Sequence, residues 1–109
     1  GFVSKLTGLE PYDRFKYAIY GKRYKDAKRH ATAGVQAAIE KDITFFNGFD
    51  KIASGKGTST HGIDYMRYEE EWKVTFADGT IKNMLAKTAL TQTPNGYKVN
   101  AFSLTEIEE

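Results

Sequence analysis

Two residues with side chains suited to catalysis, His61 and Asp64, stand three positions apart. Together they could supply a general base with an orienting carboxylate, or two ligands of a metal ion. This separation on a segment of β-strand character is not a diagnostic ligand spacing. The sequence therefore favours an ordinary loop histidine over a working pair, and it predicts neither a catalytic residue nor a metal site.

The segment GKGTST, residues 55–60, has the glycines, lysine and hydroxyls of a phosphate-binding loop. That loop requires the order G-x-x-x-x-G-K-[ST]. Here Lys56 is followed by Gly57, and Asp50 stands where the first glycine belongs. The segment fails the motif, so no nucleotide or other cofactor is expected.

Five of the 16 Lys and Arg residues fall within residues 18–32. Lys22, Lys25 and Arg29 have helical spacing and lie opposite an apolar stripe that begins at Tyr24, which predicts a solvated helix face that could contact a partner. Phosphate contact is the alternative. Surfaces that bind nucleic acid interleave aromatic rings with the charges, whereas Tyr24 is expected to point inward. With a net charge of +2, no nucleic-acid partner is expected.

The first half of the chain has helical periodicity. Pro11 and Asp13 indicate a helix start, and the apolar positions change face after Gly21, so the helix must break there. His30 ends the second piece and is interpreted as a cation that favours a helix C-terminus. A third helix is expected from Thr32 to Asn47 and Gly48.

From Lys51 onward the apolar positions alternate, as in β-strands. Asp78-Gly79 and Pro94-Asn95-Gly96 indicate hairpin turns, and a change of face between Ala101 and Phe102 indicates a bulge. The run of glutamates at 69–71 is interpreted as edge-strand charge that discourages aggregation.

This order of elements predicts an α+β domain over residues 1–109, with residues 1–9 as a flexible lead-in. N-terminal helices would pack on a curved, cone-like antiparallel sheet of about four strands. A filled core is favoured over a ligand cavity inside that cone. The residues expected on the inner side are Phe15, Ile19, Ile39, Trp72, Phe76 and Tyr97.

The segments FKYAIYGKRYKDAKRHAT, EEWKVTFADGT and GYKVNAFSL resemble the nuclear-transport-factor-2-like (NTF2-like), or cystatin-like, superfamily. Within it, the chain is most similar to short extracytoplasmic domains of bacterial lipoproteins. The resemblance implies a non-enzymatic binding or assembly domain outside the cytoplasm, held at a membrane through an upstream anchor, with a protein partner of unknown identity.

Two alternatives follow from the same resemblance. The chain is also similar to soluble domains of membrane-anchored conjugation and type IV secretion scaffold proteins, which implies self-association as a homo-oligomer. The superfamily's isomerases and dehydratases imply a small enzyme or a carrier of lipophilic ligands that uses the cone cavity. No position in this sequence matches their catalytic carboxylate, which counts against the enzyme alternative.

Overall fold

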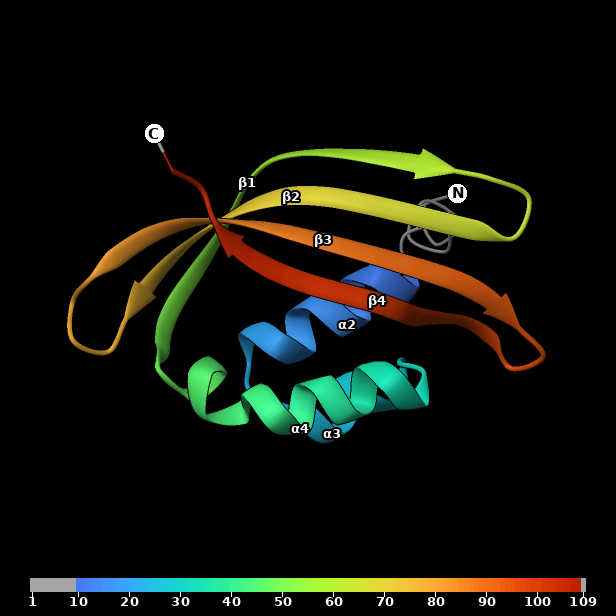
Figure 1. The fold of residues 1–109 in the computed structure, drawn as a ribbon, viewed down its shortest axis with the longest axis horizontal. Coiled ribbons are helices and arrows are strands. Elements are labelled where there is room, and N and C mark those ends of the chain that lie inside the picture. Colours follow the sequence, from blue (N-terminus) through green and yellow to red (C-terminus); the bar gives the residue numbers. More distant parts are fainter. Residues whose placement is uncertain (1–9, 109) are drawn as a thin grey trace.

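Helices come first and strands follow, as the sequence predicts (Figure 1). The computed structural model describes residues 10–108, so the predicted lead-in over residues 1–9 lies outside the described residues. The elements are α2 (Glu10–Tyr20), α3 (Tyr24–Arg29), α4 (Ala33–Asn47), β1 (Phe49–His61), β2 (Tyr65–Phe76), β3 (Ile81–Thr93) and β4 (Gly96–Glu106).

The four strands form one antiparallel sheet in the order β1-β2-β3-β4. The sheet curves, and the three helices lie together on its concave side, with α2 against the strands (Figure 1). The α+β class and the curved sheet predicted from the sequence are therefore confirmed. Among residues 10–108, no helix combines the length and the apolar character that crossing a membrane requires.

Side chains fill the space between α2, α4 and the sheet. Phe15, Ile19, Ile39 and Trp72 are each less than 2% exposed. Their rings and branches pack together, with the Phe102 ring lying 5.1 Å from that of Phe15 and 5.8 Å from that of Trp72. The other two residues expected on the inner side are half-buried against this cluster, and they are Phe76 and Tyr97.

The strand register shifts at three places. Two shifts lie in β1, between Phe49 and Lys51 and between Ser54 and Gly57. The third lies in β4, where Ala101 opposite Ala89 gives way to Val99 opposite Leu90. It confirms the bulge predicted from the sequence, because it lets both Val99 and the more distal apolar residues of β4 face the core. Ala101 is exposed, so the change of face comes before Ala101 and not between Ala101 and Phe102.

The helical segment breaks where the sequence predicts, but the left-handed residue is Lys22, with φ of 58°, and not Gly21. The Arg23 amide donates to the Ala18 carbonyl at 2.8 Å and the Lys22 amide donates to the Ile19 carbonyl at 3.1 Å. These two bonds are those of a Schellman motif, in which glycine usually takes the left-handed position. Lys22 therefore lies in a turn and not on α3, which corrects the predicted three-residue helix face.

Replacing Lys22 by glycine is expected to stabilise the fold, because glycine adopts a positive φ without steric cost. The expected gain is about 1 kcal/mol in the free energy of unfolding, or roughly 4 °C in Tm. The matched control is Lys25→Gly on α3, which should lose about 1 kcal/mol. Thermal unfolding followed by circular dichroism measures both variants, and a loss of stability in Lys22→Gly would contradict this description of the turn.

Candidate functional site

Alternation along β2 turns one acidic side chain toward the helices. Trp72 and Val74 face the core, and Glu70 has the same parity, whereas Glu69 and Glu71 face outward. Strand β2 is paired on both sides, with β1 and with β3. The interpretation of these glutamates as edge-strand charges is therefore wrong, because β2 is an inner strand and Glu70 lies on the concave side.

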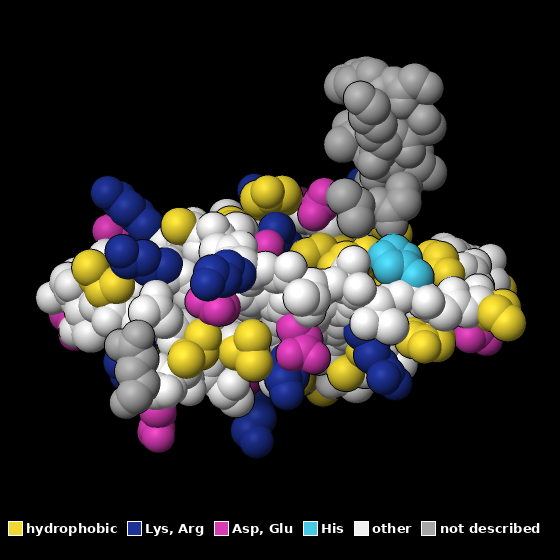
Figure 2. Space-filling model, turned by 90° about the horizontal axis from the view of Figure 1, so that it is seen from above, with side chains coloured by type: hydrophobic (Ala, Val, Ile, Leu, Met, Phe, Trp, Pro, Cys, Tyr) yellow, Lys and Arg dark blue, Asp and Glu magenta, His cyan; other side chains and the backbone are white. Residues whose placement is uncertain are grey.

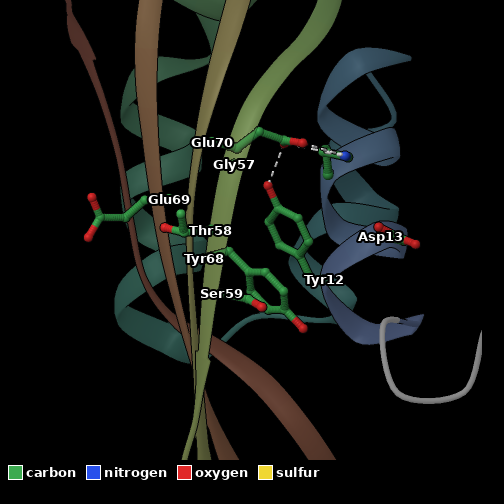
Figure 3. A pocket seen from close by; sticks show the side chains of 9 residues that line it. Tyr12, Asp13, Gly57, Thr58, Ser59, Tyr68, Glu69 and Glu70 are labelled. Atoms are coloured by element: carbon green, nitrogen blue, oxygen red, sulfur yellow. Dashed lines mark hydrogen bonds and ion pairs between the residues drawn. The ribbon is translucent and has the colours of Figure 1, made fainter.

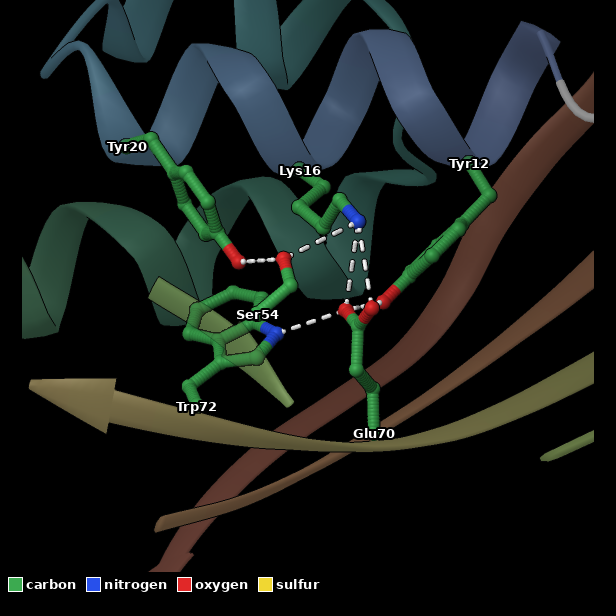
Figure 4. A network of polar contacts seen from close by, with 6 residues as sticks. All are labelled: Tyr12, Lys16, Tyr20, Ser54, Glu70 and Trp72. Carbon is green, nitrogen blue, oxygen red and sulfur yellow. Dashed lines mark hydrogen bonds and ion pairs between the residues drawn. The ribbon is translucent and has the colours of Figure 1, made fainter. Parts of the chain in front are cut away.

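Lys16 of α2 meets Glu70 in a buried ion pair (Figure 4). The Nζ atom lies 3.2 Å from Oε2 and 3.3 Å from Oε1, and the two side chains are 7% and 15% exposed. Tyr12, Lys16 and Tyr20 follow one another at intervals of four residues, so α2 presents all three on one face.

The remaining polar atoms around this ion pair are also bonded. The Tyr12 hydroxyl donates to Glu70 Oε1 at 2.7 Å, and the Trp72 indole N–H donates to the same oxygen at 2.8 Å. Lys16 also donates to Ser54 Oγ at 3.4 Å, and that hydroxyl is bonded to the Tyr20 hydroxyl at 2.7 Å. Since charges that leave water must be paired and hydrogen-bonded, this arrangement is what allows both ions to be buried.

The tyrosines of this network remain neutral. Burial raises the pKa of Tyr12 far above its usual value, and the hydrogen bond to Glu70 and the charge of that carboxylate raise it further. Burial also raises the pKa of Tyr20, although its hydrogen bond to Ser54 acts in the opposite direction. Glu70 accepts bonds from Lys16, Tyr12 and Trp72. Its carboxylate is therefore held as an acceptor in the network and is poorly placed to act as a general base.

A hollow of about 350 Å³ opens beside this network, between α2 and strands β1 and β2. In Figure 3, Tyr12 and Tyr68 lie side by side in it, whereas Asp13 and Glu69 point away. The two tyrosine rings stack with centroids 4.2 Å apart and planes 7° apart. The residues that line the hollow are Tyr12, Asp13, Lys16, Gly57, Thr58, Ser59, Tyr68, Glu69 and Glu70.

The electrostatics of the hollow are nearly balanced at its floor, where Lys16 neutralises Glu70. Asp13 is partly buried on the α2 side, and burial raises the pKa of its carboxyl; Lys16 acts in the opposite direction and the Glu70 charge adds to the rise. Tyr12 and Tyr68 stack on each other and are only 4% and 6% exposed, so the hollow offers little ring surface, and no acid–base pair among its lining residues is aimed into it.

The predicted pair of His61 and Asp64 does not join this network. His61 is the last residue of β1, and its ring meets that of Tyr68 edge-on at 6.0 Å. Asp64 is exposed in the following turn, where its backbone carbonyl accepts the Gln92 amide at 2.9 Å. Among residues 10–108, no cluster of three or more histidine, aspartate or glutamate side chains could hold a metal ion.

The predicted partner surface is exposed but is not one continuous helix face. Lys22 donates to the Asn47 carbonyl from its turn, and Arg29 pairs with Asp26 at 3.1 Å. Lys25 is exposed on α3. The interpretation of His30 as a cation is also not supported, because burial, and then Lys98 and the arginines at 14 and 29, lower the pKa of its imidazole.

The network of Tyr12, Lys16, Ser54 and Glu70 was not predicted from the sequence. Two signals were present, and the first is that Glu70 has the same strand parity as Trp72 and Val74. Lys16, which follows Phe15 directly, also lies on the helix face of Tyr12. Only the position of α2 against β2 shows that the side chains of Lys16 and Glu70 are in contact.

No protein-family model matches the sequence, and no curated protein sequence shows a significant match. The similarity to known proteins lies in the structure. The chain has an NTF2-like, cystatin-like fold. A variant of the protein Rd1NTF2_05 superposes with a TM-score of 0.77 at 7% identity, over 94% of this chain and 99% of that one.

Two further solved structures support the same fold. A candidate dehydratase of the NTF2-like family from Streptomyces avermitilis has a TM-score of 0.74 at 9% identity, over 96% of both chains. A Nostoc punctiforme protein of unknown function with a cystatin-like fold has a TM-score of 0.66 at 9% identity, over 96% of this chain and 92% of that one. At such identities the comparisons show the fold alone, and the fold contains proteins of different activities.

Removal of the Glu70 carboxylate is expected to destabilise the protein strongly, because it leaves the Lys16 charge buried without a counter-charge. Glu70→Ala should cost about 3–5 kcal/mol in the free energy of unfolding. The neighbouring outward residue gives the matched control, and Glu69→Ala should change stability by no more than about 0.5 kcal/mol. Urea unfolding measures both. Equal effects of the two substitutions would contradict the assignment of Glu70 to the interior.

Proposed function

We propose that this domain is a non-enzymatic binding domain that takes an extended polypeptide segment along strand β1, beside the hollow of Tyr12 and Tyr68. The observation that supports this most directly is the combination of an exposed edge strand with a neighbouring hollow. The binding role agrees with the resemblance to domains that act through protein contacts.

Strand β1 offers the edge. Within residues 10–108 it has a hydrogen-bonded neighbour on one side only, and its residues from Ala53 to His61 are exposed. The bulge between Ser54 and Gly57 interrupts the edge, and it contains Lys56. Bulges and lysines on edge strands commonly prevent edge-to-edge aggregation. The stretch Gly57–His61 beyond the bulge is regularly paired with β2, and its side chains are small up to His61. An incoming strand can gain main-chain hydrogen bonds there.

The hollow provides selectivity for the side chains of such an added strand. Gly57, Thr58 and Ser59 of β1 line it together with the stacked rings of Tyr12 and Tyr68 (Figure 3). A side chain projecting from the added strand would lie beside the hydroxyls of Thr58 and Ser59 and over the small exposed parts of the two tyrosine rings. Aromatic and hydroxyl groups suit an uncharged or amphipathic side chain.

The surface charge on this side is mixed. Figure 2 views the molecule from the side on which β1 lies, and lysine, arginine, aspartate and glutamate side chains are interspersed there with small apolar groups. A continuous basic surface would favour nucleic acid, whereas this mixture of both signs is compatible with a polypeptide partner.

The enzyme alternative has less support. An isomerase or dehydratase of this fold needs a base that faces a substrate cavity, but Glu70 is engaged with Lys16, Tyr12 and Trp72. The interior where a substrate would lie is occupied by fully buried side chains. Both observations favour binding at the rim of the cone over catalysis within it.

The cellular location is part of the proposal and rests on the sequence resemblance alone. We propose an extracytoplasmic domain held at a membrane by an upstream anchor. Intact-mass and N-terminal mapping of the protein from its native cell tests this location, with a lipid-modified cysteine or a membrane helix before residue 1 as the expected result and a cytoplasmic start as the contradicting one.

Peptides selected from a random library on the immobilised domain provide the test of strand addition. We expect selected peptides to shift the NMR signals of the backbone amides at Gly57–His61 and to protect them from hydrogen exchange. Ser59→Lys places a charge on the concave side of the edge and should weaken binding at least about tenfold.

Ser103→Lys puts the same substitution on the exposed part of β4 and serves as the control, so binding should be unchanged. The proposal fails if selected peptides shift amides elsewhere and leave β1 unaffected, or if Ser59→Lys and Ser103→Lys bind equally well. Sedimentation of the domain alone distinguishes a second copy as the natural source of the strand, since self-association should then also be lost in Ser59→Lys.

A further inference from the structure

A second hollow, of about 340 Å³, lies between the start of α2, the end of α3 and the turn that joins β3 to β4. Its charged lining is entirely basic, since no aspartate or glutamate is among the lining residues. Those residues are Pro11, Arg14, Arg29, His30, Asn95, Gly96, Tyr97 and Lys98. It shares no lining residue with the hollow beside β1.

The fold itself gathers these basic groups. Helix α3 ends at Arg29, and the chain then runs beside β4, where the Val99 amide donates to the His30 carbonyl at 2.7 Å. The Thr32 amide donates a hydrogen bond to the Val99 carbonyl at 2.9 Å. Lys98 is thereby placed against the end of α3, and its Nζ atom donates to the Arg29 carbonyl at 2.8 Å.

Most of the charged groups that act on His30 are basic. Burial is the largest cause that lowers the pKa of His30, and the charges of Lys98, Arg14 and Arg29 lower it further. Asp26 is the one charged group that acts in the opposite direction. Asp26 pairs with Arg29 at 3.1 Å, and it lines with Asp13 an adjoining hollow that shares Arg14, Arg29 and His30 with this one.

We infer that this hollow is a binding site for a phosphate-bearing small molecule, held by Arg29, Lys98 and His30 with Arg14 at its rim. Guanidinium and ammonium groups form charge-assisted hydrogen bonds with phosphate oxygens, and the imidazole of His30 adds a further N–H donor. A dianion suits a site with several cations and no acidic lining residue better than a carboxylate does. The volume is sufficient for a phosphate monoester with a small organic group.

This site differs from the helix face considered in the sequence. Arg29 is common to both, but Lys22 and Lys25 are not among the residues that line the hollow. The inference does not depend on peptide binding at β1, because the two places share no lining residue and can be tested by separate variants.

Sodium phosphate added at constant ionic strength is the first probe, followed by phenyl phosphate. The chain has two histidines, so the imidazole NMR signals of His30 and His61 report the site and an internal control. We expect a saturable shift of the His30 signals only, and a pKa of His30 that rises when phosphate is bound, since an anion favours the imidazolium form.

Arg29→Gln and Lys98→Gln are expected to weaken phosphate binding about tenfold each. Arg29→Lys keeps the charge and should retain most of the affinity, which separates loss of the site from loss of the fold. Lys25→Gln, on the same helix but outside the hollow, should leave the affinity unchanged. Amide NMR spectra of each variant establish that it is folded.

Three results would overturn the inference. One is a His30 signal that does not respond to phosphate or phenyl phosphate. Another is benzoate binding as tightly as phenyl phosphate, which would assign a carboxylate ligand. The third is evidence for a diffuse basic surface. Either equal weakening by Lys25→Gln and Arg29→Gln, or a short oligothymidylate that binds and shifts the signals of Lys22 and Lys25, would provide it.

Discussion

The buried ion pair of Lys16 and Glu70 is the constraint on which the arrangement of this domain depends. Two charges that have left water must be placed within contact distance and have their remaining atoms hydrogen-bonded. The pair sits at 3.2 Å, with Tyr12, Trp72 and Ser54 completing the bonds. This condition fixes the rotation of α2 about its axis and its position along β2, because other placements leave a charge without its partner.

The same network decides where ligands can bind. Since Glu70 and Lys16 neutralise each other, the concave side offers no unpaired charge at this position, and large apolar side chains fill the remaining interior. Two hollows lie outside this filled interior, one beside β1 and one at the end of α3. The domain thus has an NTF2-like fold, and the two binding places that we propose for it lie outside its packed core.

Much of the fold follows from the sequence, because it rests on local patterns. The break after Gly21, the third helix, the alternation in β2 and the two glycine-containing turns are each set by neighbouring residues. The left-handed residue at Lys22 could not be predicted in this way, since residue preference points to Gly21, whereas the Schellman bonds of the helix end select the next position.

The sites were less predictable, because they depend on which elements meet. Glu70 shares the strand parity of Trp72 and Val74, but its ion pair is seen only once α2 is placed against β2. Lys98 is far from Arg29 and His30 in the sequence, and only the pairing of the chain after α3 with β4 brings all three to one hollow. His61 and Asp64 are close in sequence, but His61 ends β1 whereas Asp64 lies in the turn before β2, so they do not form a common site.

A double-mutant cycle between Lys16→Met and Glu70→Met measures the central interaction directly. If the ion pair holds α2 on the sheet, the double variant should be more stable than the sum of the single effects implies, with a coupling free energy of about 2–3 kcal/mol. Additive effects, with no coupling between the two positions, would contradict the account and would mean that packing alone positions α2.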